Sequence, residues 1–364
     1  MALTATQKKH AKANSKMGRS LTQRLLACLC LLALAGSATA DALPDARRAY
    51  AAGEFTRAIE LYRSLAEQGQ AAAQFSLGLM YDRGQGVAQD YREAEKWYRL
   101  AAEQGFISAQ SRLGFMYGNG LGVSQDYQAA EKWYRLAAQQ GNAEAQFKLG
   151  FMYSQGIGVP HDEQEALKWF QLAADQGAVL AQVFLGVMHE KGSGVQLNYQ
   201  QALKWYRLAA EQGNAEAQFR LGAMYNLGQG VAQDFNEAVR LYRLAAEQGF
   251  DQAQSRLGVM HQSGRGVTQD YQQAEKWYRL AAEQGNADAQ FRLGLMYLTG
   301  RGVAKNEITY LMWTGLAIDN ARDAQARKKY AEAFELVAKL MPPGQISEVQ
   351  ELVKECTGRK FKGC

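Results

Sequence analysis

Glycine pairs of the form Gly-x-Gly recur along the chain, beginning with Gly84/Gly86 and Gly120/Gly122. In nucleotide-binding proteins such a pair cradles phosphate when a strand precedes it and a helix follows at once. Here each pair instead follows a run of residues with helical apolar spacing, and it recurs at a fixed interval. The pairs are therefore predicted to form turns, and no phosphate site is expected.

Histidines and carboxylates, the usual acids and bases of catalysis, form no arrangement that predicts a reaction. Beyond residue 40 the histidines are His161, His189 and His261, and the last two stand where other repeats have tyrosine. Asp90 and its equivalents are interpreted as helix caps. Because no nucleophile, base and orienting group can be assigned, the sequence predicts no catalytic, metal-binding or cofactor-binding residue and a protein that is not an enzyme.

Four cysteines lie near the two ends of the chain: Cys28, Cys30, Cys356 and Cys364. The C-terminal pair can close a small disulfide loop in an oxidising compartment, or it can remain two free thiols. Both interpretations stay open. No histidine lies near this pair, so no metal site is expected there.

The first 40 residues have the pattern of a secretory signal peptide. Six basic residues and no acidic ones precede an apolar run at 25–36, and Ala38-Thr39-Ala40 follows it. Cleavage is predicted before Asp41, which places the mature protein in the periplasm or outside the cell. The apolar run is too short to span a bilayer, so no stable membrane insertion is expected. An uncleaved anchor, translation from Met17 and lipidation at Cys28 are the alternatives.

Loss of this leader changes the charge balance of the chain. The whole sequence has 41 Lys and Arg against 36 Asp and Glu, and 35 basic residues remain without the six in the leader. A mature chain that is close to neutral gives no electrostatic reason to expect nucleic acid as a partner.

A Leu-Gly pair recurs seven times at a step of 36 residues, from Leu77 to Leu293. A unit of this length buries its apolar face only against its neighbours, so most of the chain is predicted to be a solenoid. In one unit, Asn142 is predicted to cap a helix from residue 143 to about 154, and Asp162 opens a second helix that stops before Gly177. The glycine turn at 156–159 separates the two helices.

Two further sets of residues keep the same step. Short polar residues recur where each second helix should begin, namely Asp90, Asp126, Asp162, Asn198, Asp234, Asp270 and Asn306. Tryptophan recurs within those helices, and core packing is favoured over ligand stacking for Trp97, Trp133, Trp169, Trp205, Trp277 and Trp313.

The pattern divides the chain into four parts. Residues 1–40 are the signal peptide, 41–70 a degenerate N-terminal repeat, 71–319 seven repeats, and 320–364 C-terminal capping helices with a short tail. Nothing resembles a linker, so one elongated domain is expected from residue 41 to about 355.

The repeated motif at 215–234 reads Ala-x-Ala-Gln-Phe-x-Leu-Gly-x-Met-Tyr-x-x-Gly-x-Gly-Val-x-x-Asp, and units close with Ala-x-x-Trp-Tyr-x-x-Ala-Ala-x-x-Gly. From about residue 71 to 314 it resembles the Sel-one-like repeat, a relative of the tetratricopeptide repeat. The resemblance implies an all-α fold, a right-handed superhelical solenoid of helix-turn-helix repeats whose first helices line the concave side. Known members are mostly adaptors. One secreted branch has a disulfide in each repeat and binds penicillin, but no repeat here contains cysteine, so that activity is not carried over.

By alignment with tetratricopeptide geometry, the exposed concave positions lie three residues before and one after each repeat glycine. The partner-binding residues predicted in this way are Phe75, Phe115, Phe147, Phe151, Phe219 and Phe291, edged by the cations Arg112, Lys148, Arg220, Arg256 and Arg292. An apolar track with a cationic edge suits an acidic or aromatic peptide segment. In the alternative interpretation the phenylalanines pack between repeats and the cations are a solvated edge.

The leading functional hypothesis is a non-enzymatic periplasmic or secreted scaffold, a monomer that binds a protein or peptide partner on its concave surface. One alternative is a protein that binds or hydrolyses cell-wall fragments or β-lactams. Another is a secreted factor that binds a host protein. No cofactor is expected in the leading hypothesis.

Overall fold

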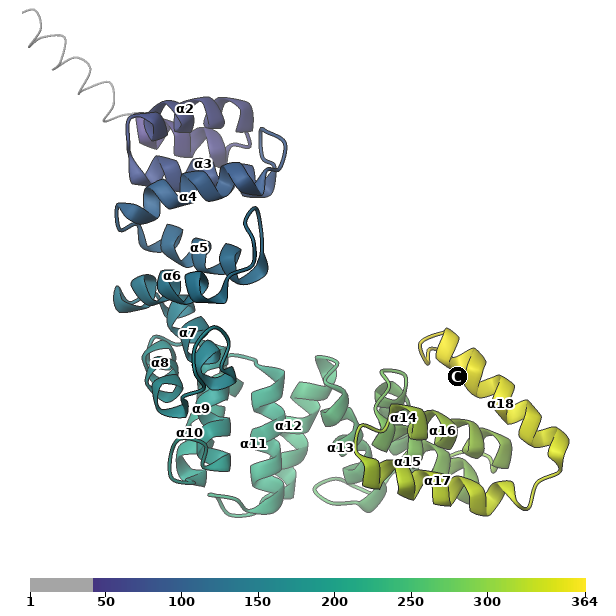
Figure 1. Ribbon diagram of the computed structural model, residues 1–364. Helices are drawn as coiled ribbons and strands as arrows, with labels where there is room; N and C mark the ends of the chain where they lie inside the picture. The colour runs from purple at the N-terminus through teal and green to yellow at the C-terminus, as the bar shows by residue number, and fades with distance from the viewer. Residues whose placement is uncertain (1–41) are drawn as a thin grey trace, which may run out of the picture. The chain divides into compact units, whose positions relative to one another are not determined.

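The computed structural model describes residues 42–364, and the regular structure in this part of the chain is helical. The predicted signal peptide and its cleavage site lie outside these residues. The chain divides after His161 into two compact units, which we call the N-terminal unit (42–161) and the C-terminal unit (162–364). The repeat pattern predicts one domain from residue 41 to about 355 and gives no sign of this division. Each unit stacks helices in consecutive order (Figure 1), so the all-helical solenoid is confirmed.

The N-terminal unit starts with a helical stretch at residues 42–51. It continues with α2 (Phe55–Glu67), α3 (Ala71–Arg83), α4 (Tyr91–Glu103), α5 (Ile107–Asn119), α6 (Tyr127–Gln139) and α7 (Ala143–Gln155). Gly53, with φ +78°, joins the first two helices. Within the unit α3 packs against α4 and α5 against α6, and each pair packs on the next helix.

The C-terminal unit repeats this arrangement and ends in two additional helices. Its helices are α8 (Glu163–Asp175), α9 (Val179–Lys191), α10 (Tyr199–Glu211), α11 (Ala215–Leu227), α12 (Phe235–Glu247), α13 (Asp251–Ser263), α14 (Tyr271–Ala282), α15 (Ala287–Thr299), α16 (Glu307–Asn320), α17 (Ala324–Ala338) and α18 (Pro343–Gly358). We call the odd-numbered helices α3 to α15 first helices and the even-numbered helices α4 to α16 second helices.

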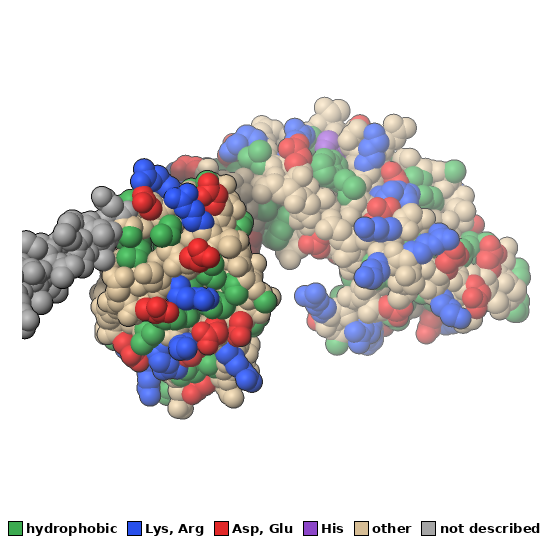
Figure 2. Space-filling model, turned by 90° about the horizontal axis from the view of Figure 1, so that it is seen from above, with side chains coloured by type: hydrophobic (Ala, Val, Ile, Leu, Met, Phe, Trp, Pro, Cys, Tyr) green, Lys and Arg blue, Asp and Glu red, His purple; other side chains and the backbone are tan. Residues whose placement is uncertain are grey.

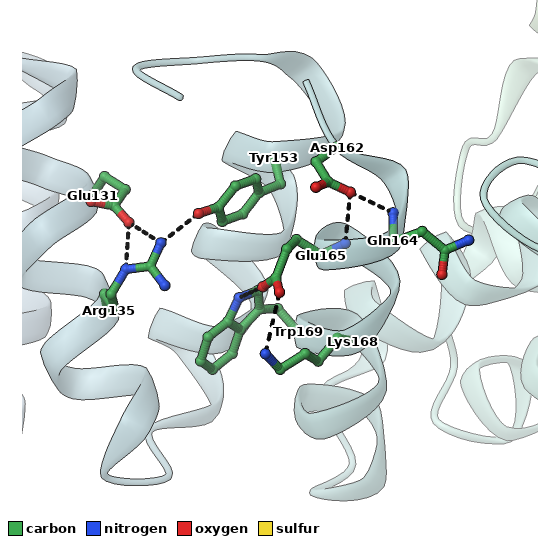
Figure 3. Close-up of polar contacts among 8 residues, drawn as sticks. All are labelled: Glu131, Arg135, Tyr153, Asp162, Gln164, Glu165, Lys168 and Trp169. Carbon is green, nitrogen blue, oxygen red and sulfur yellow. Dashed lines mark hydrogen bonds and ion pairs between the residues drawn. The ribbon is translucent and has the colours of Figure 1, made fainter. Parts of the chain in front are cut away.

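The predicted caps set the start of the second helices. The Asp90 carboxylate accepts hydrogen bonds from the backbone N–H groups of Arg92 and Glu93 at 2.8 and 3.1 Å. Asp162 does the same at the start of α8, where the side chain of Glu165 accepts a bond from Trp169 Nε1 at 3.1 Å (Figure 3). All seven predicted second-helix caps accept at least one such bond. Each cap of this kind stabilises the protein by about 1 kcal/mol.

The glycine of each Leu-Gly pair allows a first helix to approach its second helix closely. A Cβ atom on Gly114 would lie 2.7 Å from the ring of Tyr134, and one on Gly258 would lie 2.6 Å from Tyr278. Both tyrosines are buried. The most deeply buried aromatic ladder of the repeats therefore includes the residues that directly follow five of the six tryptophans, namely Tyr98, Tyr134, Phe170, Tyr206 and Tyr278.

The tryptophans themselves are less uniform. Trp169, Trp205 and Trp313 are buried. Trp97 and its equivalents at 133 and 277 are half-buried, and each packs against a core cluster of its own unit. The tryptophans thus all contact the core, as the sequence predicts, although three of them keep an exposed edge.

The two helices beyond the repeats cover the end of the C-terminal unit. Helices α17 and α18 both pack on α16, and the Tyr310 hydroxyl of α16 donates to the Ala333 carbonyl of α17 at 2.8 Å. A disulfide joins Cys356 to Cys364, with Cα atoms 5.8 Å apart. These contacts form the kind of terminal cap that a repeat array needs for its last apolar face.

Candidate functional site

The first helices carry partly accessible phenylalanines at the predicted positions. Phe75, Phe115, Phe147 and Phe151 of the N-terminal unit and Phe219 of the C-terminal unit are each half-buried. Phe75 and Phe219 pack against a core cluster of their own unit. These rings therefore contact the core and keep an accessible side at the same time, which combines elements of both interpretations of the sequence.

Phe291 lies in a different environment from the other five phenylalanines. Only 7% of its surface is exposed. Its ring stacks on Tyr330 of α17, with ring centroids 4.6 Å apart. The capping helix thus covers this position, so we leave Phe291 out of the candidate site.

Two hollows with equivalent linings lie on the first helices, one in each unit. The hollow of the C-terminal unit, about 350 Å³, is lined among others by Phe219, Ser255, Arg256, Asn286, Asp288 and Arg292. The hollow of the N-terminal unit, about 240 Å³, is lined among others by Phe75, Ser111, Arg112, Asn142 and Glu144. Each of these five residues stands 144 positions, or four repeats, before its counterpart. We call them the C-terminal hollow and the N-terminal hollow.

Small side chains create both hollows. Ser111 and Ser255 stand at the repeat position that Phe75 occupies in an earlier repeat, and both serines are buried. The same two repeats carry Phe106 and Phe250 where others have an asparagine cap. The Phe106 ring lies 5.1 Å from that of Phe75, and the equivalent pair in the C-terminal unit is 5.3 Å apart. The missing ring leaves space, and Phe75 or Phe219, each supported by a tilted contact with the second ring, gives its hollow an apolar wall.

Most of the predicted cations are engaged in ion pairs. Arg112 Nε lies 3.2 Å from Asp82 Oδ2 in the N-terminal unit. Arg220 contacts two carboxylates, Glu190 at 3.3 Å and Glu216 at 2.8 Å. Arg292 Nε lies 2.7 Å from Asp288 Oδ2, across the C-terminal hollow's edge. Arg112 and Arg220 join different helices, Arg292 pairs within its own helix, and the charges of all three are largely compensated.

Arg256 differs from these arginines although it occupies the same repeat position. Asn226 stands where the pairing acid of Arg112 would be, and Gln252 stands four residues before Arg256, where Asp288 stands before Arg292. The side chain of Arg256 is exposed. Among residues 42–364 no carboxylate forms an ion pair with it. The C-terminal hollow therefore contains a cation whose charge is not compensated locally.

The buried tyrosines close to Arg112 and Arg256 differ in the same way as the two arginines, since only one of them has an acidic partner. The Tyr98 hydroxyl donates to Asp82 Oδ2 at 3.0 Å, and burial together with the charge of Asp82 raises the pKa of Tyr98 well above its ordinary value. Burial raises the pKa of Tyr242 to about 12, and nearby Arg256 opposes that rise. Both hydroxyls stay protonated at neutral pH, but Tyr98 alone of the two has an acidic partner.

A polar ladder that the sequence analysis misses holds successive repeats in register. In the N-terminal unit, Gln110 Nε2 donates to the Ala102 carbonyl at 3.1 Å, and its Oε1 accepts from Gln140 Nε2 at 2.7 Å. The same pair of bonds recurs in the C-terminal unit. A glutamine at a fixed position inside an apolar stripe is the signal that could have predicted this ladder.

Surface charge is mixed rather than gathered into one field. Figure 2 shows acidic and basic side chains interspersed over the face seen in both units. A local example is Arg135, whose guanidinium contacts Glu131 and the hydroxyl of Tyr153 (Figure 3). Local pairing, rather than net charge, therefore decides which cations are available to a partner.

Metal ligands and membrane-spanning helices can be sought only in the part of the chain that the structure describes. In the described part of the chain, no group of three His, Cys, Asp or Glu side chains is placed to hold a metal ion. Within the same residues, no helix has both the length and the apolar composition to cross a membrane. Half-buried His189 and buried His261 have lowered pKa values, and loss of solvent contact is the main cause for both.

Comparison with known proteins places these features in a family context. A family model described as the Sel1 repeat matches residues 54–70, 71–106, 107–142, 143–177, 179–214, 215–250, 251–286 and 287–309. A Sel1 repeat protein from Oxalobacter formigenes is 36% identical, with 79% of this chain and 86% of that chain covered and a TM-score of 0.63. A protective antigen of uropathogenic Escherichia coli strains is 30% identical, with 84% and 81% covered and a TM-score of 0.54. No curated protein matches the chain.

Proposed function

Since the chain belongs to the Sel1 repeat family, we propose that it is an exported, non-enzymatic scaffold that binds a protein partner on its first helices. The helical repeats supply the frame, and the two hollows supply the contact points. The proposal takes the protein as a monomer in which each unit offers its own hollow.

The observation that carries this proposal is the recurrence of one hollow in both units. Each combines an aromatic wall with an arginine and an amide, at equivalent repeat positions. Aromatic residues and arginine are enriched at protein interfaces, and a few of them usually dominate the binding free energy. A half-exposed ring such as Phe219 is suited to this role because it is already positioned by contacts with the core.

Export is supported by the predicted leader and by the C-terminal disulfide. Disulfides form and persist in oxidising compartments such as the periplasm and the cell exterior. The relative described as a protective antigen gives further support to export of this chain.

The test begins with cells that express the full chain with a C-terminal tag. N-terminal sequencing of the exported protein should give residue 41 as the first residue. The purified protein should then capture one protein in stoichiometric amount from an extract of the native envelope. A variant with Phe75→Ser and Phe219→Ser should bind that purified partner at least about tenfold more weakly, because two aromatic contacts are lost.

The matched control changes two leucines on second helices. Leu172 and Leu208 are 41% and 37% exposed, and Leu172→Ser with Leu208→Ser should leave partner binding unchanged. Circular dichroism should show the same helix content in both variants. Equal binding by the phenylalanine variant would contradict the proposed surface, and an intact leader on membrane-bound protein would contradict export.

A further inference from the structure

The two hollows share their lining but differ in the charge around one arginine. In the N-terminal hollow, Arg112 is neutralised by Asp82 at 3.2 Å. In the C-terminal hollow, Arg256 is exposed and has Asn226 at the equivalent position. The two sites therefore share five lining positions and differ in whether this arginine is paired.

Four other polar side chains that line the C-terminal hollow already have partners inside the protein, namely Ser255, Asn286, Asp288 and Arg292. Ser255 Oγ donates to Asp288 Oδ2 at 3.3 Å, and the same carboxylate contacts Arg292. Asn286 Nδ2 donates to Asp251 Oδ2 at 2.8 Å. The charge of Asp288 is thus compensated by Arg292. Arg256 remains as the charged donor of the hollow that a ligand can engage.

The wall beside Arg256 is aromatic. Phe219 lines the hollow and packs against Phe250 in a tilted arrangement, with 5.3 Å between ring centroids. An anionic group that binds Arg256 would therefore bring any neighbouring apolar group against a ring. Edge-to-face and offset contacts between rings favour an aromatic group in that place. A guanidinium binds a carboxylate through charge-assisted hydrogen bonds.

We propose that the C-terminal hollow selects a peptide segment in which an acidic side chain adjoins an aromatic one, and that Arg256 binds the carboxylate. In the N-terminal hollow the equivalent residue, Arg112, is paired with Asp82 and does not make this selection. The inference rests on the proposed scaffold function and assigns the chemistry of one of its contact points.

The repeats themselves provide the substitution that tests this assignment. A carboxylate at the repeat position of Asn226 pairs with the arginine 30 residues later in two cases, Asp82 with Arg112 and Glu190 with Arg220. Asn226→Asp is therefore expected to place a carboxylate beside Arg256 and to compensate its charge. The reciprocal change, Asp82→Asn, should release Arg112 in the N-terminal hollow.

The experiment measures fluorescence polarisation with two labelled peptides, Gly-Glu-Phe-Glu-Gly and Gly-Gln-Phe-Gln-Gly, on the full exported protein. The wild-type protein should bind the acidic peptide about tenfold more tightly, and added salt should reduce that ratio. Asn226→Asp and Arg256→Gln should each bring the ratio close to one. Asp82→Asn should add a second site that prefers the acidic peptide.

Equal affinity of the wild-type protein for the two peptides would overturn the assignment, as would an unchanged ratio in both Asn226→Asp and Arg256→Gln. Because the two substitutions alter different residues, misfolding of one leaves the other as a test. The partner-capture assay separates this failure from failure of the scaffold. If Phe75→Ser with Phe219→Ser abolishes capture while the peptide ratio is one, the scaffold stands and the role of Arg256 falls.

Discussion

The N-terminal and C-terminal hollows show how a repeat protein builds two different sites from one frame. Serine in place of phenylalanine opens both, and a phenylalanine supported by a second aromatic ring lines both. A single neighbouring residue, Asp82 in one unit and Asn226 in the other, decides whether the arginine is compensated. Residues that recur thus fix the geometry, and residues that depart from the repeat set the chemistry.

The helical cores of the two repeats that carry the hollows should be equally stable. Truncating a buried leucine in each core tests this and should give the largest effect. Leu113 and Leu257 are fully buried at equivalent positions. Leu113→Ala and Leu257→Ala should each lower the free energy of unfolding by about 2–5 kcal/mol, because a buried side chain is lost and a cavity remains. Native-state hydrogen exchange, which reports on each unit separately, is the measurement.

Leu100 and Leu244 are the controls for this pair, since both are 38% exposed at one repeat position. Their replacement by alanine should cost less than about 1 kcal/mol each. Losses for the two buried leucines that differ by more than about 1.5 kcal/mol would contradict the equivalence of the two frames.

Charge reversal of two arginines at one repeat position should give the second largest effect. Arg220→Glu removes pairs with Glu190 and Glu216 and brings a third carboxylate beside them. The expected loss of unfolding free energy is on the order of 1–3 kcal/mol. Arg256→Glu breaks no ion pair found among the described residues, so its effect should stay within about 0.5 kcal/mol. Chemical denaturation of both variants checks this, and equal losses would show that Arg256 is paired after all.

Helix positions were predictable because the responsible interactions are local. Asp162 caps the backbone of residues two and three positions away, and Gly156 ends α7 in the left-handed conformation with φ +67°. Apolar residues that recur with the helical period then place Leu149 in the core. Each of these signals is contained in a few neighbouring residues, so a single sequence is sufficient to read them.

The availability of individual site residues was less predictable because it depends on contacts between repeats. The sequence analysis groups five cations as one edge, whereas the structure separates Arg256 from paired arginines such as Arg220. The constant offset of 30 residues between acid and arginine could have revealed this difference. No such offset links Phe291 to Tyr330, because α17 lies outside the repeats. The repeat pattern therefore could not predict the burial of Phe291.

The smallest effect concerns pH and one further difference between the units. The position of Tyr117 in the N-terminal unit is occupied by His261 in the C-terminal unit. Burial lowers the pKa of His261, the nearby charge of Arg243 lowers it further, and Asp270 partly opposes them. The folded protein therefore keeps His261 neutral at pH values where the unfolded chain already binds a proton.

Stability falls with decreasing pH wherever the unfolded state binds more protons than the folded state. The C-terminal unit should thus lose stability as the pH falls through the ordinary titration range of histidine, and the loss should level off below the lowered pKa of the folded form. His189, whose pKa is also lowered by burial, adds to the same trend. His189→Tyr with His261→Tyr should remove this part of the pH dependence, and Tyr117→His should introduce it into the N-terminal unit. Hydrogen exchange of each unit at pH 7.5 and 5.5 measures the loss of stability on acidification. If the C-terminal unit loses the same stability with and without its two histidines, burial of neutral histidine is not the cause.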